Sequence, residues 1–404
     1  IIQEYLSTYP HAIQSFIVLL EFIGKHSPFL INKLNFPIFE NISNNLLLAN
    51  HSLKQLNIID DSRHFDKNRS VGCLLNNCVT PMGVRKFFYI LNNPTIDISI
   101  LNESYDITEN LLNDEYYVNI RKNIIGITDI EKLKRKIIIN KFSPKDLVIL
   151  SQNIDKLFAC LTFCSSNQKF SSFIMNNYQI NINKFIENCE NFNNCIKKTF
   201  NLINCSKLDD ISNDKLKSFN SNEIIFVNSE IDEGIDKVVN NCLNNREKLY
   251  GIANKLSEII GNIEKGNKNY VKIHETPKSD PCLIATNRRC TLLKNWLKTN
   301  KESSVSIFFK NYNNQEDEFS FDLSDINFGK MGSNKKEEYI TNSNISKLTS
   351  VTQKSVDLLI LELQKFFNNF IKSHILNNLD FIDTLIDVIT KIDLSQSKAY
   401  IAHK

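Results

Sequence analysis

The feature that most constrains this chain is a long segment near its middle that contains no proline. Between Ile231 and Ile260, apolar residues recur with the period of an α-helix. At about 1.5 Å per residue, the segment predicts a rod of roughly 45 Å. A helix of that length requires a packing partner, and Ser350–Asn377 repeats the apolar pattern, again without proline. We therefore expect two long antiparallel helices, one outgoing and one returning.

The residues between these two helices are the only part of the chain with β patterning. Apolar and polar residues alternate in Tyr270–His274 and, more loosely, in Cys282–Thr286, and a turn rich in Pro, Ser and Asp separates them. This pattern is typical of a β-hairpin. Ser304–Lys310 and Phe319–Leu323 offer two further strands. We expect a small β-containing insert carried by the helix pair.

Composition indicates a mainly α, multi-helical protein. The chain has 404 residues, more than one simple core usually holds, and only 10 Gly and 8 Pro, the residues that break helices. We expect four parts: a helical base over residues 1–225, an outgoing helix over 226–265, the β-containing insert over 266–340, and a returning helix with its continuation over 341–404.

Two helix starts can be read from local chemistry. Thr80 is a good N-cap residue, and Pro81 suits the first helical position. Gly83, inside the first turn, costs the helix about 1 kcal/mol relative to Ala, which predicts that another backbone passes close by. Ser143-Pro144, followed by Asp146, gives a second start of the capping-box kind.

Cysteine usage argues against metal binding. The ten cysteines include no CxxC pair, and none is flanked by His at zinc-finger spacing. We expect no metal site and reduced, mostly buried thiols in an intracellular protein. The sequence also contains no signal peptide and no run of about 18 uncharged apolar residues, so no membrane partner is expected.

No pattern in the chain points to catalysis. Neither Gly24-Lys25 nor Gly329-Lys330 is followed by Ser or Thr, so no phosphate-binding P-loop is present. The seven histidines are scattered without HExxH spacing, and His374 is interpreted as a helix-surface residue. The polar run Asp60–Ser70 could be a catalytic cluster, but a solvated turn is the better interpretation because its spacing fits no known mechanism. We expect no catalytic residue and no cofactor site in this chain.

Basic residues concentrate in the β-containing insert. Residues 266–301 contain eight Lys and Arg but only Glu275 and Asp280 as acids, a local excess of about six charges in a chain of net charge +3. Such residues on an exposed module suit phosphate contacts, which position a protein on DNA without reading its sequence. Lysines that merely keep an exposed tip soluble would give the same pattern. The candidate phosphate contacts are Lys268, Lys272, Lys278, Arg288, Arg289 and Lys294.

Three short motifs follow one another in the first part of the chain. Thr80–Arg85 reads TPMGVR and is followed by a helix and Asn92-Asn93-Pro94, Thr128–Arg135 reads TDIEKLKR, and Ser143–Leu147 reads SPKDL. In order and spacing, over roughly residues 45–155, they resemble the T-x-M-G-x-R…P, D-[IL]-E-R-x-L-x-R and S-P-x-D-L motifs of the MutS family of DNA mismatch-repair proteins. The segment Tyr270–Lys294 looks like the β segment of that family's clamp, although the usual glycine-rich stretch is not reproduced.

The resemblance implies a division of labour. MutS-like chains form homo- or heterodimers that encircle double-stranded DNA, with a clamp that contacts the backbone and a lever that transmits nucleotide state to it. Thr80, Gly83 and Arg85 would then be structural residues at the base of the lever. ATP and Mg²⁺ would be bound by a P-loop ATPase domain outside this chain. The protein would act wherever its DNA is, in a nucleus, an organelle or a viral factory.

Two other functions remain open. A helical scaffold that binds proteins, with the basic hairpin as a docking knob, is the main alternative to DNA binding. An enzyme with a site in the Asp60–Arg69 loop is the third. Salt titration separates DNA binding from protein binding, because affinity that depends on phosphate neutralisation falls steeply with salt concentration.

Overall fold

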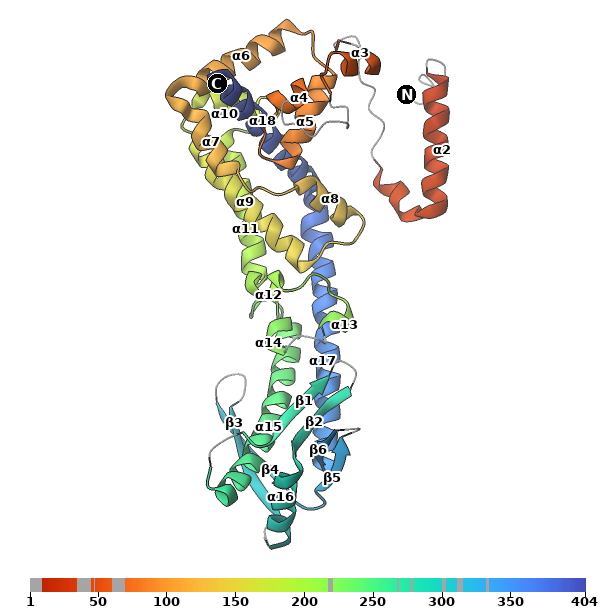
Figure 1. Ribbon diagram of the computed structural model, residues 1–404, viewed down its shortest axis with the longest axis vertical. Coiled ribbons are helices and arrows are strands. Elements are labelled where there is room, and N and C mark those ends of the chain that lie inside the picture. The colour runs from red at the N-terminus through yellow and green to blue at the C-terminus, as the bar shows by residue number, and fades with distance from the viewer. Residues whose placement is uncertain are drawn as a thin grey trace. The chain divides into compact units, whose positions relative to one another are not determined.

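The structure is a computed structural model that describes residues 9–34, 45–46, 48–59, 70–216, 221–266, 269–276, 279–299, 303–310, 315–331 and 334–404. The chain divides into two compact units. The first unit is Ile1–Phe142, Ile149–Asn194 and Ile371–Lys404, and the second is Ser143–Val148 and Cys195–Phe370. The described residues are mainly helical, and their six strands all belong to the second unit (Figure 1), which confirms the predicted class of a mainly α protein with a small β insert.

Within the part of the first unit that the structure describes, all the elements are helices. Its elements are α2 (Pro10–His26), η1 (Pro28–Lys33), α3 (Asn50–Gln55), α4 (Val71–Leu75), α5 (Pro81–Asn92), α6 (Ile98–Leu112), η3 (Asn113–Glu115), α7 (Tyr116–Ile124), α8 (Ile130–Ile138), most of α9 (Pro144–Cys164), α10 (Gln168–Met175), most of α11 (Ile182–Thr199), η4 (Ile371–Ile375), η5 (Leu376–Asn378) and α18 (Leu379–His403).

Helix α18 is the central element of this first unit. It packs against α5, α6, α7, α8 and α10. Leu385, Ile389 and Ile392 on α18 have no exposed surface, as expected for a helix with neighbours on several sides. Segments far apart in the sequence are therefore joined through the last helix of the chain.

One described helix, α9, is long and apolar enough to cross a membrane. However, 56% of its most apolar 18-residue window is buried inside the protein. Tyr116 donates a hydrogen bond to the carbonyl of Phe163 on this helix at 2.8 Å, and the two rings stack. These contacts are typical of a core helix.

The second unit combines two long helices with all six strands. Its elements are α12 (Leu202–Ser206), α13 (Asn213–Leu216), α14 (Ser221–Ile224), α15 (Glu233–Glu264), β1 (Lys272–Thr276), β2 (Ser279–Thr286), α16 (Asn287–Thr299), β3 (Ser304–Lys310), β4 (Glu316–Asp322), β5 (Asn327–Met331), β6 (Asn334–Thr341) and α17 (Ser343–Phe370).

Helices α15 and α17 lie side by side as the predicted long antiparallel pair (Figure 1). The side chain of Asp232 caps α15 by accepting a hydrogen bond from the backbone N–H of Ile235 at 2.9 Å, and Asn342 caps α17 in the same way through Ile345. The returning helix starts seven residues earlier than its apolar pattern indicated. It ends at Phe370, where the π-helical turn η4 interrupts the expected continuous helix.

The strands form two antiparallel sheets, one with the order β1-β2-β6-β5 and one of β3 and β4. The four predicted strands are present, and the hairpin pairs Ile273 with Leu283. Strands β5 and β6 and the helix α16 were not predicted. The β interpretation of Tyr270–Lys294 is therefore wrong over its last eight residues, Asn287–Lys294, which are helical because Cys290 and Leu293 supply an apolar face at helical spacing. We call β1–β6 with α16 the strand module.

Candidate nucleic-acid interface

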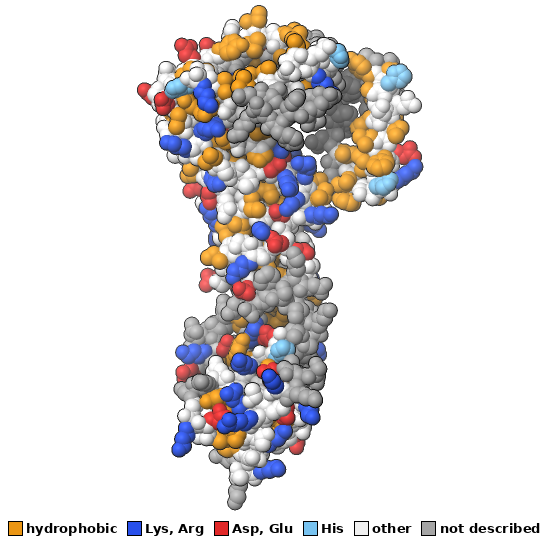
Figure 2. Space-filling view, viewed as in Figure 1, with side chains coloured by type: hydrophobic (Ala, Val, Ile, Leu, Met, Phe, Trp, Pro, Cys, Tyr) orange, Lys and Arg blue, Asp and Glu red, His pale blue; other side chains and the backbone are white. Residues whose placement is uncertain are grey.

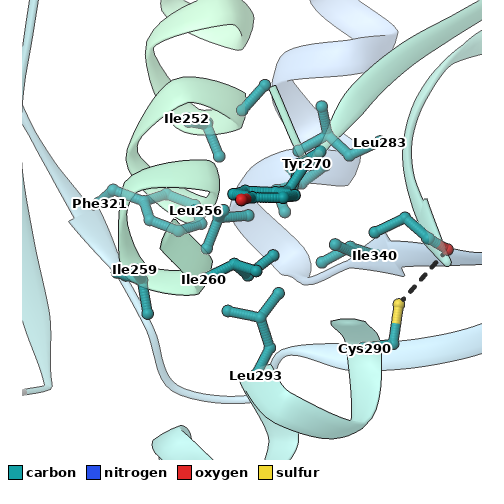
Figure 3. Close-up of a cluster of buried hydrophobic side chains, with 14 of the residues drawn as sticks. Ile252, Leu256, Ile259, Ile260, Tyr270, Leu283, Cys290, Leu293, Phe321 and Ile340 are labelled. Carbon is teal, nitrogen blue, oxygen red and sulfur yellow. Dashed lines mark hydrogen bonds between the residues drawn. The ribbon is translucent and has the colours of Figure 1, made fainter. Parts of the chain in front are cut away.

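One apolar cluster holds α16 against the strands and α15. The ring of Tyr270 lies inside it, surrounded by Leu256, Ile260, Leu283 and Ile340, with Leu293 of α16 below (Figure 3). The cluster fixes where the polar face of α16 points.

Cys290 adds a polar link at the start of α16. Its thiol donates a hydrogen bond to the carbonyl of Ala285 at the end of β2, with 3.6 Å between sulfur and oxygen. Burial, followed by the negative charge of Glu338, raises the pKa of Cys290 to about 11, against the smaller opposing effect of Lys294. The thiol is therefore protonated at neutral pH and serves as a packed donor.

Arg288 and Arg289 lie together in the first turn of α16. The carboxylate of Glu264, the last residue of α15, lies between them, 3.7 Å from Nε of Arg288 and 3.8 Å from Nε of Arg289. The Arg288 side chain is 84% exposed, whereas Arg289 is 30% exposed and its guanidinium lies over the Tyr270 ring at 4.5 Å. These two candidate residues face a surface hollow of about 540 Å³, which Ile263, Glu264, Thr286, Arg288, Arg289 and Leu292 line.

Lys294 lies on the same helix but has a closer acidic partner. Its ammonium donates a hydrogen bond of 3.1 Å to Glu338 on β6, and it also lies over the Phe328 ring at 4.8 Å. Its side chain is less than half exposed. A phosphate would have to compete with this hydrogen-bonded ion pair.

The other three candidates are not gathered at this site. Lys272 on β1 is exposed, but its neighbour Ile273 packs against the apolar cluster, so the alternation of a strand directs Lys272 to the other side of the sheet. Lys268 and Lys278 lie outside the described residues.

The local charge is smaller than the count over residues 266–301 suggested. Glu264 and Glu338 come from outside that window, yet they lie against Arg288, Arg289 and Lys294. Figure 2 shows Lys and Arg interleaved with Asp and Glu over this end of the unit rather than a surface of one sign. Glu264 lies two residues before the window, so its position at the end of the long helix was a usable signal. No feature of the sequence indicated that Glu338 would lie here, because its strand was not predicted.

In the first unit, the Thr80 motif surrounds a buried carboxylate on α18. Asp393 has no exposed surface, and its oxygens accept hydrogen bonds from the backbone N–H groups of Val79 at 3.0 Å and Thr80 at 2.8 Å, and from the Gln396 side chain at 2.7 Å. A Cβ on Gly83 would come within 2.1 Å of Asp393 Oδ2. The close neighbour expected at Gly83 is thus a side chain, not a backbone.

The last residue of that motif joins it to the second motif. Both terminal nitrogens of Arg85 donate to the carboxylate of Asp129 at 2.8 Å, and Nη2 also lies 2.6 Å from Glu131. Asp129 accepts a further bond from the Lys132 N–H as the N-cap of α8. The hydrogen bonds from Arg85 are the main reason why the pKa of Asp129 lies below its ordinary value.

The third motif forms the predicted capping box. The Ser143 hydroxyl accepts a hydrogen bond from the Asp146 N–H at 3.2 Å, and Asp146 Oδ2 accepts one from the Ser143 N–H at 3.1 Å. All three motifs therefore have structural roles that suit their residue types.

Comparison with known families gives one match that spans most of the chain, MutS domain III over residues 51–399. The chain belongs to the MutS family. Its matched residues include the three motifs, both long helices and the whole strand module, so the suspected relationship is confirmed well beyond residues 45–155.

Known MutS proteins resemble the chain at low identity. A putative DNA mismatch repair protein, a mutS homologue of Acanthamoeba polyphaga mimivirus, is 26% identical over 186 residues, 43% of this chain and 16% of that protein. DNA mismatch repair protein MutS of Carboxydothermus hydrogenoformans is 25% identical over 146 residues, 36% of this chain and 17% of its own length. That of Ehrlichia chaffeensis is 30% identical over 113 residues, 28% of this chain and 14% of its own. The chain thus spans about a sixth of the relatives that it matches.

The other candidate residues lie outside this interface. Among the described residues, no group of three or more His, Cys, Asp or Glu side chains could hold a metal ion. All ten cysteines are free thiols. His374 is half-buried rather than on the helix surface, because its ring stacks on Phe192 at 5.0 Å. Residues 60–69 of the Asp60–Ser70 run lie outside the described residues, and Ser70 caps α4.

Proposed function

We propose that this chain is the lever and clamp region of a MutS-like mismatch-repair protein and that its strand module grips duplex DNA through the phosphate backbone. The observation that carries the proposal is the pair Arg288 and Arg289 in the first turn of α16. The positive end of a helix dipole and two guanidinium groups together favour phosphate oxygens. Such contacts do not read base edges, so binding would be independent of sequence.

The long helix pair supplies the mechanical part of the proposal. Helix α15 has 32 residues and α17 has 28, and the strand module is inserted between them in the chain. A rigid rod converts a small rotation at one end into a larger displacement at the other. Coupling would run to an ATPase domain outside these residues, where ATP and Mg²⁺ would bind, since this chain has no P-loop.

The partners follow from the family and are part of the same proposal. The chain would work as a homo- or heterodimer with another MutS-like chain around double-stranded DNA, within the cell compartment that holds that DNA. The chain itself would have no enzymatic activity.

The test is charge reversal at the two arginines. Arg288→Glu with Arg289→Glu should lower duplex affinity at least tenfold at about 50 mM salt and reduce the log–log salt slope by about two, one for each phosphate lost. Lys169→Glu with Lys184→Glu, exposed residues of α10 and α11, makes the same change in net charge away from the site. Unchanged affinity in the arginine variant, with its circular dichroism intact, would remove the proposal.

The alternative function, a scaffold that binds proteins, has one observation in its favour. Four apolar residues of α2 are each more than half exposed: Ile17, Val18, Leu19 and Phe22. Binding through such a face would depend weakly on salt, whereas phosphate contacts weaken steeply as salt rises. A titration from about 50 to 200 mM salt therefore separates the two functions.

A further inference from the structure

The charges at both helix ends around the 540 Å³ hollow oppose the helix dipoles. Arg288 and Arg289 occupy the first turn of α16, which contains no acidic residue, although the positive end of a helix disfavours cations. Glu264 ends α15, where the negative end of the dipole disfavours an anion. Neither placement stabilises its own helix. The two placements compensate for one another, because the Glu264 carboxylate offsets one of the two guanidinium charges.

The contact of Glu264 with the two arginines is looser than two ion pairs that described residues of the strand module make. Arg246 and Glu275 are hydrogen-bonded at 2.8 Å, and Lys294 and Glu338 at 3.1 Å. Glu264, by contrast, stands 3.7 and 3.8 Å from the two Nε atoms, beyond hydrogen-bond distance. An ion pair that is long, partly exposed and without a hydrogen bond is the easiest of these to exchange for another anion.

We propose that Glu264 competes with DNA phosphate for Arg288 and Arg289. Both arginines already share this carboxylate, so a phosphate of the DNA backbone must displace it in order to bind them. This proposal rests on the proposed function and describes how that same site is regulated. Glu264 lowers the net charge of the arginine pair from two to one and repels an incoming phosphate. The contact keeps sequence-independent affinity low, which suits a protein that must release the DNA backbone.

The arginines differ in how they meet the phosphate. Arg289 is held over the Tyr270 ring, so its guanidinium is pre-oriented. Arg288 is 84% exposed and can turn toward a phosphate without breaking a ring contact. We expect Arg289 to define the position of the bound phosphate and Arg288 to add charge.

The experiment compares two carboxylate removals on the same helix in the 404-residue chain. Glu264→Gln should tighten binding of a fluorescent duplex of random sequence about two- to fivefold at 50 mM salt, the range of a surface ion pair. Glu247→Gln changes the net charge equally, but this exposed residue lies about 25 Å away along α15, well beyond the Debye length of about 14 Å at that salt, so the affinity of this variant should stay close to the wild-type value. The difference between the variants should shrink at about 200 mM salt.

A third variant separates this inference from the proposed function. In a background of Arg288→Ala with Arg289→Ala, adding Glu264→Gln should no longer change affinity, since the carboxylate acts through these two cations. Unchanged or weaker binding by Glu264→Gln alone, or an equal gain from Glu247→Gln, would overturn the inference while the charge-reversal test of the arginines still stood. If reversing the arginines has no effect, the proposed function itself fails.

Discussion

The hydroxyl of Thr80 donates a hydrogen bond of 2.6 Å to Oδ2 of Asp393, a carboxylate without exposed surface. The same hydroxyl accepts the N–H of Gly83 at 3.1 Å. One side chain thus caps α5 and binds α18. The carboxylate lies at the N-terminal end of α5, where the helix dipole favours a negative charge. This arrangement explains why Thr and Gly stand three residues apart in the motif.

A double-mutant cycle should detect this contact. Thr80→Val and Asp393→Asn should each lower the free energy of unfolding by about 2–4 kcal/mol, because each leaves buried polar groups without partners. Their combined effect should fall short of the sum by about 1–3 kcal/mol. Urea unfolding measures all three variants. Thr162→Val, which removes an exposed hydroxyl on α9, is the control and should change stability by about 0.5 kcal/mol or less. If the effects of the two substitutions on stability simply add, the result contradicts this contact.

Adding one methyl group at Gly83 should be strongly destabilising. The new Cβ would meet the Asp393 carboxylate at 2.1 Å, and that carboxylate is held by several hydrogen bonds. Gly83→Ala should therefore lose more than about 2 kcal/mol, even though Ala favours a helix by about 1 kcal/mol. Gly24→Ala, whose Cβ would meet only the flexible end of Ile31 at 3.1 Å, should be neutral or slightly stabilising. Thermal unfolding of both variants measures whether stability falls in Gly83→Ala and is kept in Gly24→Ala.

The Arg85–Asp129 pair predicts a specific pH dependence. Arg85 holds the pKa of Asp129 below its ordinary value of 3.8, so the folded state binds a proton there less readily than the unfolded state does. The stabilisation is present above pH 3.8 and is lost as pH falls through the lower folded pKa.

Asp129→Asn isolates this charge effect, because Asn remains a good N-cap. Because the pair is partly exposed, the variant should lose only about 0.5–1 kcal/mol at pH 7. The difference from the wild type should narrow in urea titrations below pH 3.8. Glu190→Gln, an exposed residue of α11, serves as control. If the difference in unfolding free energy between wild type and Asp129→Asn stays constant between pH 7 and pH 3, the ion pair is not its source.

Truncation of the strand-module core should release α16. Leu293 is 1% exposed within the apolar cluster, so Leu293→Ala should lower the stability of the module by about 2–5 kcal/mol. Amide exchange along α16 should accelerate, and DNA affinity should fall with it. Phe308→Ala removes a larger side chain that is 66% exposed and should have little effect on either measurement. Slow exchange of α16 in Leu293→Ala would show that the cluster does not hold this helix.

Much of the architecture could be predicted because it depends on local pattern. The long helices, the first hairpin and the caps at Thr80 and Ser143 each follow from neighbouring residues. Helix α16 was missed although Cys290, Leu293 and Leu297 recur at helical spacing. It lies between strands, and its first turn carries two arginines that a helix start disfavours.

The chemistry around the candidate site could not be read in the same way, because it depends on long-range contacts. Lys294 is balanced by Glu338 from 44 residues away, and Thr80 is bound by Asp393 from 313 residues away. Hydrophobic periodicity in the sequence does not indicate pairs between residues that lie so far apart. The count of basic residues therefore located the strand module but overestimated its free charge.

The contact between Thr80 and Asp393 also sets an order of events during synthesis. The second unit is almost continuous in sequence, from Cys195 to Phe370, whereas the first unit is completed only by α18. At about 5–20 residues per second, the ribosome needs roughly 10–35 s to make the intervening unit. During that time, Met82 and the apolar face of α7 lack the cover that α18 gives them. The first unit, whose synthesis begins earlier, can therefore complete its packing only after the whole of the second unit has been made.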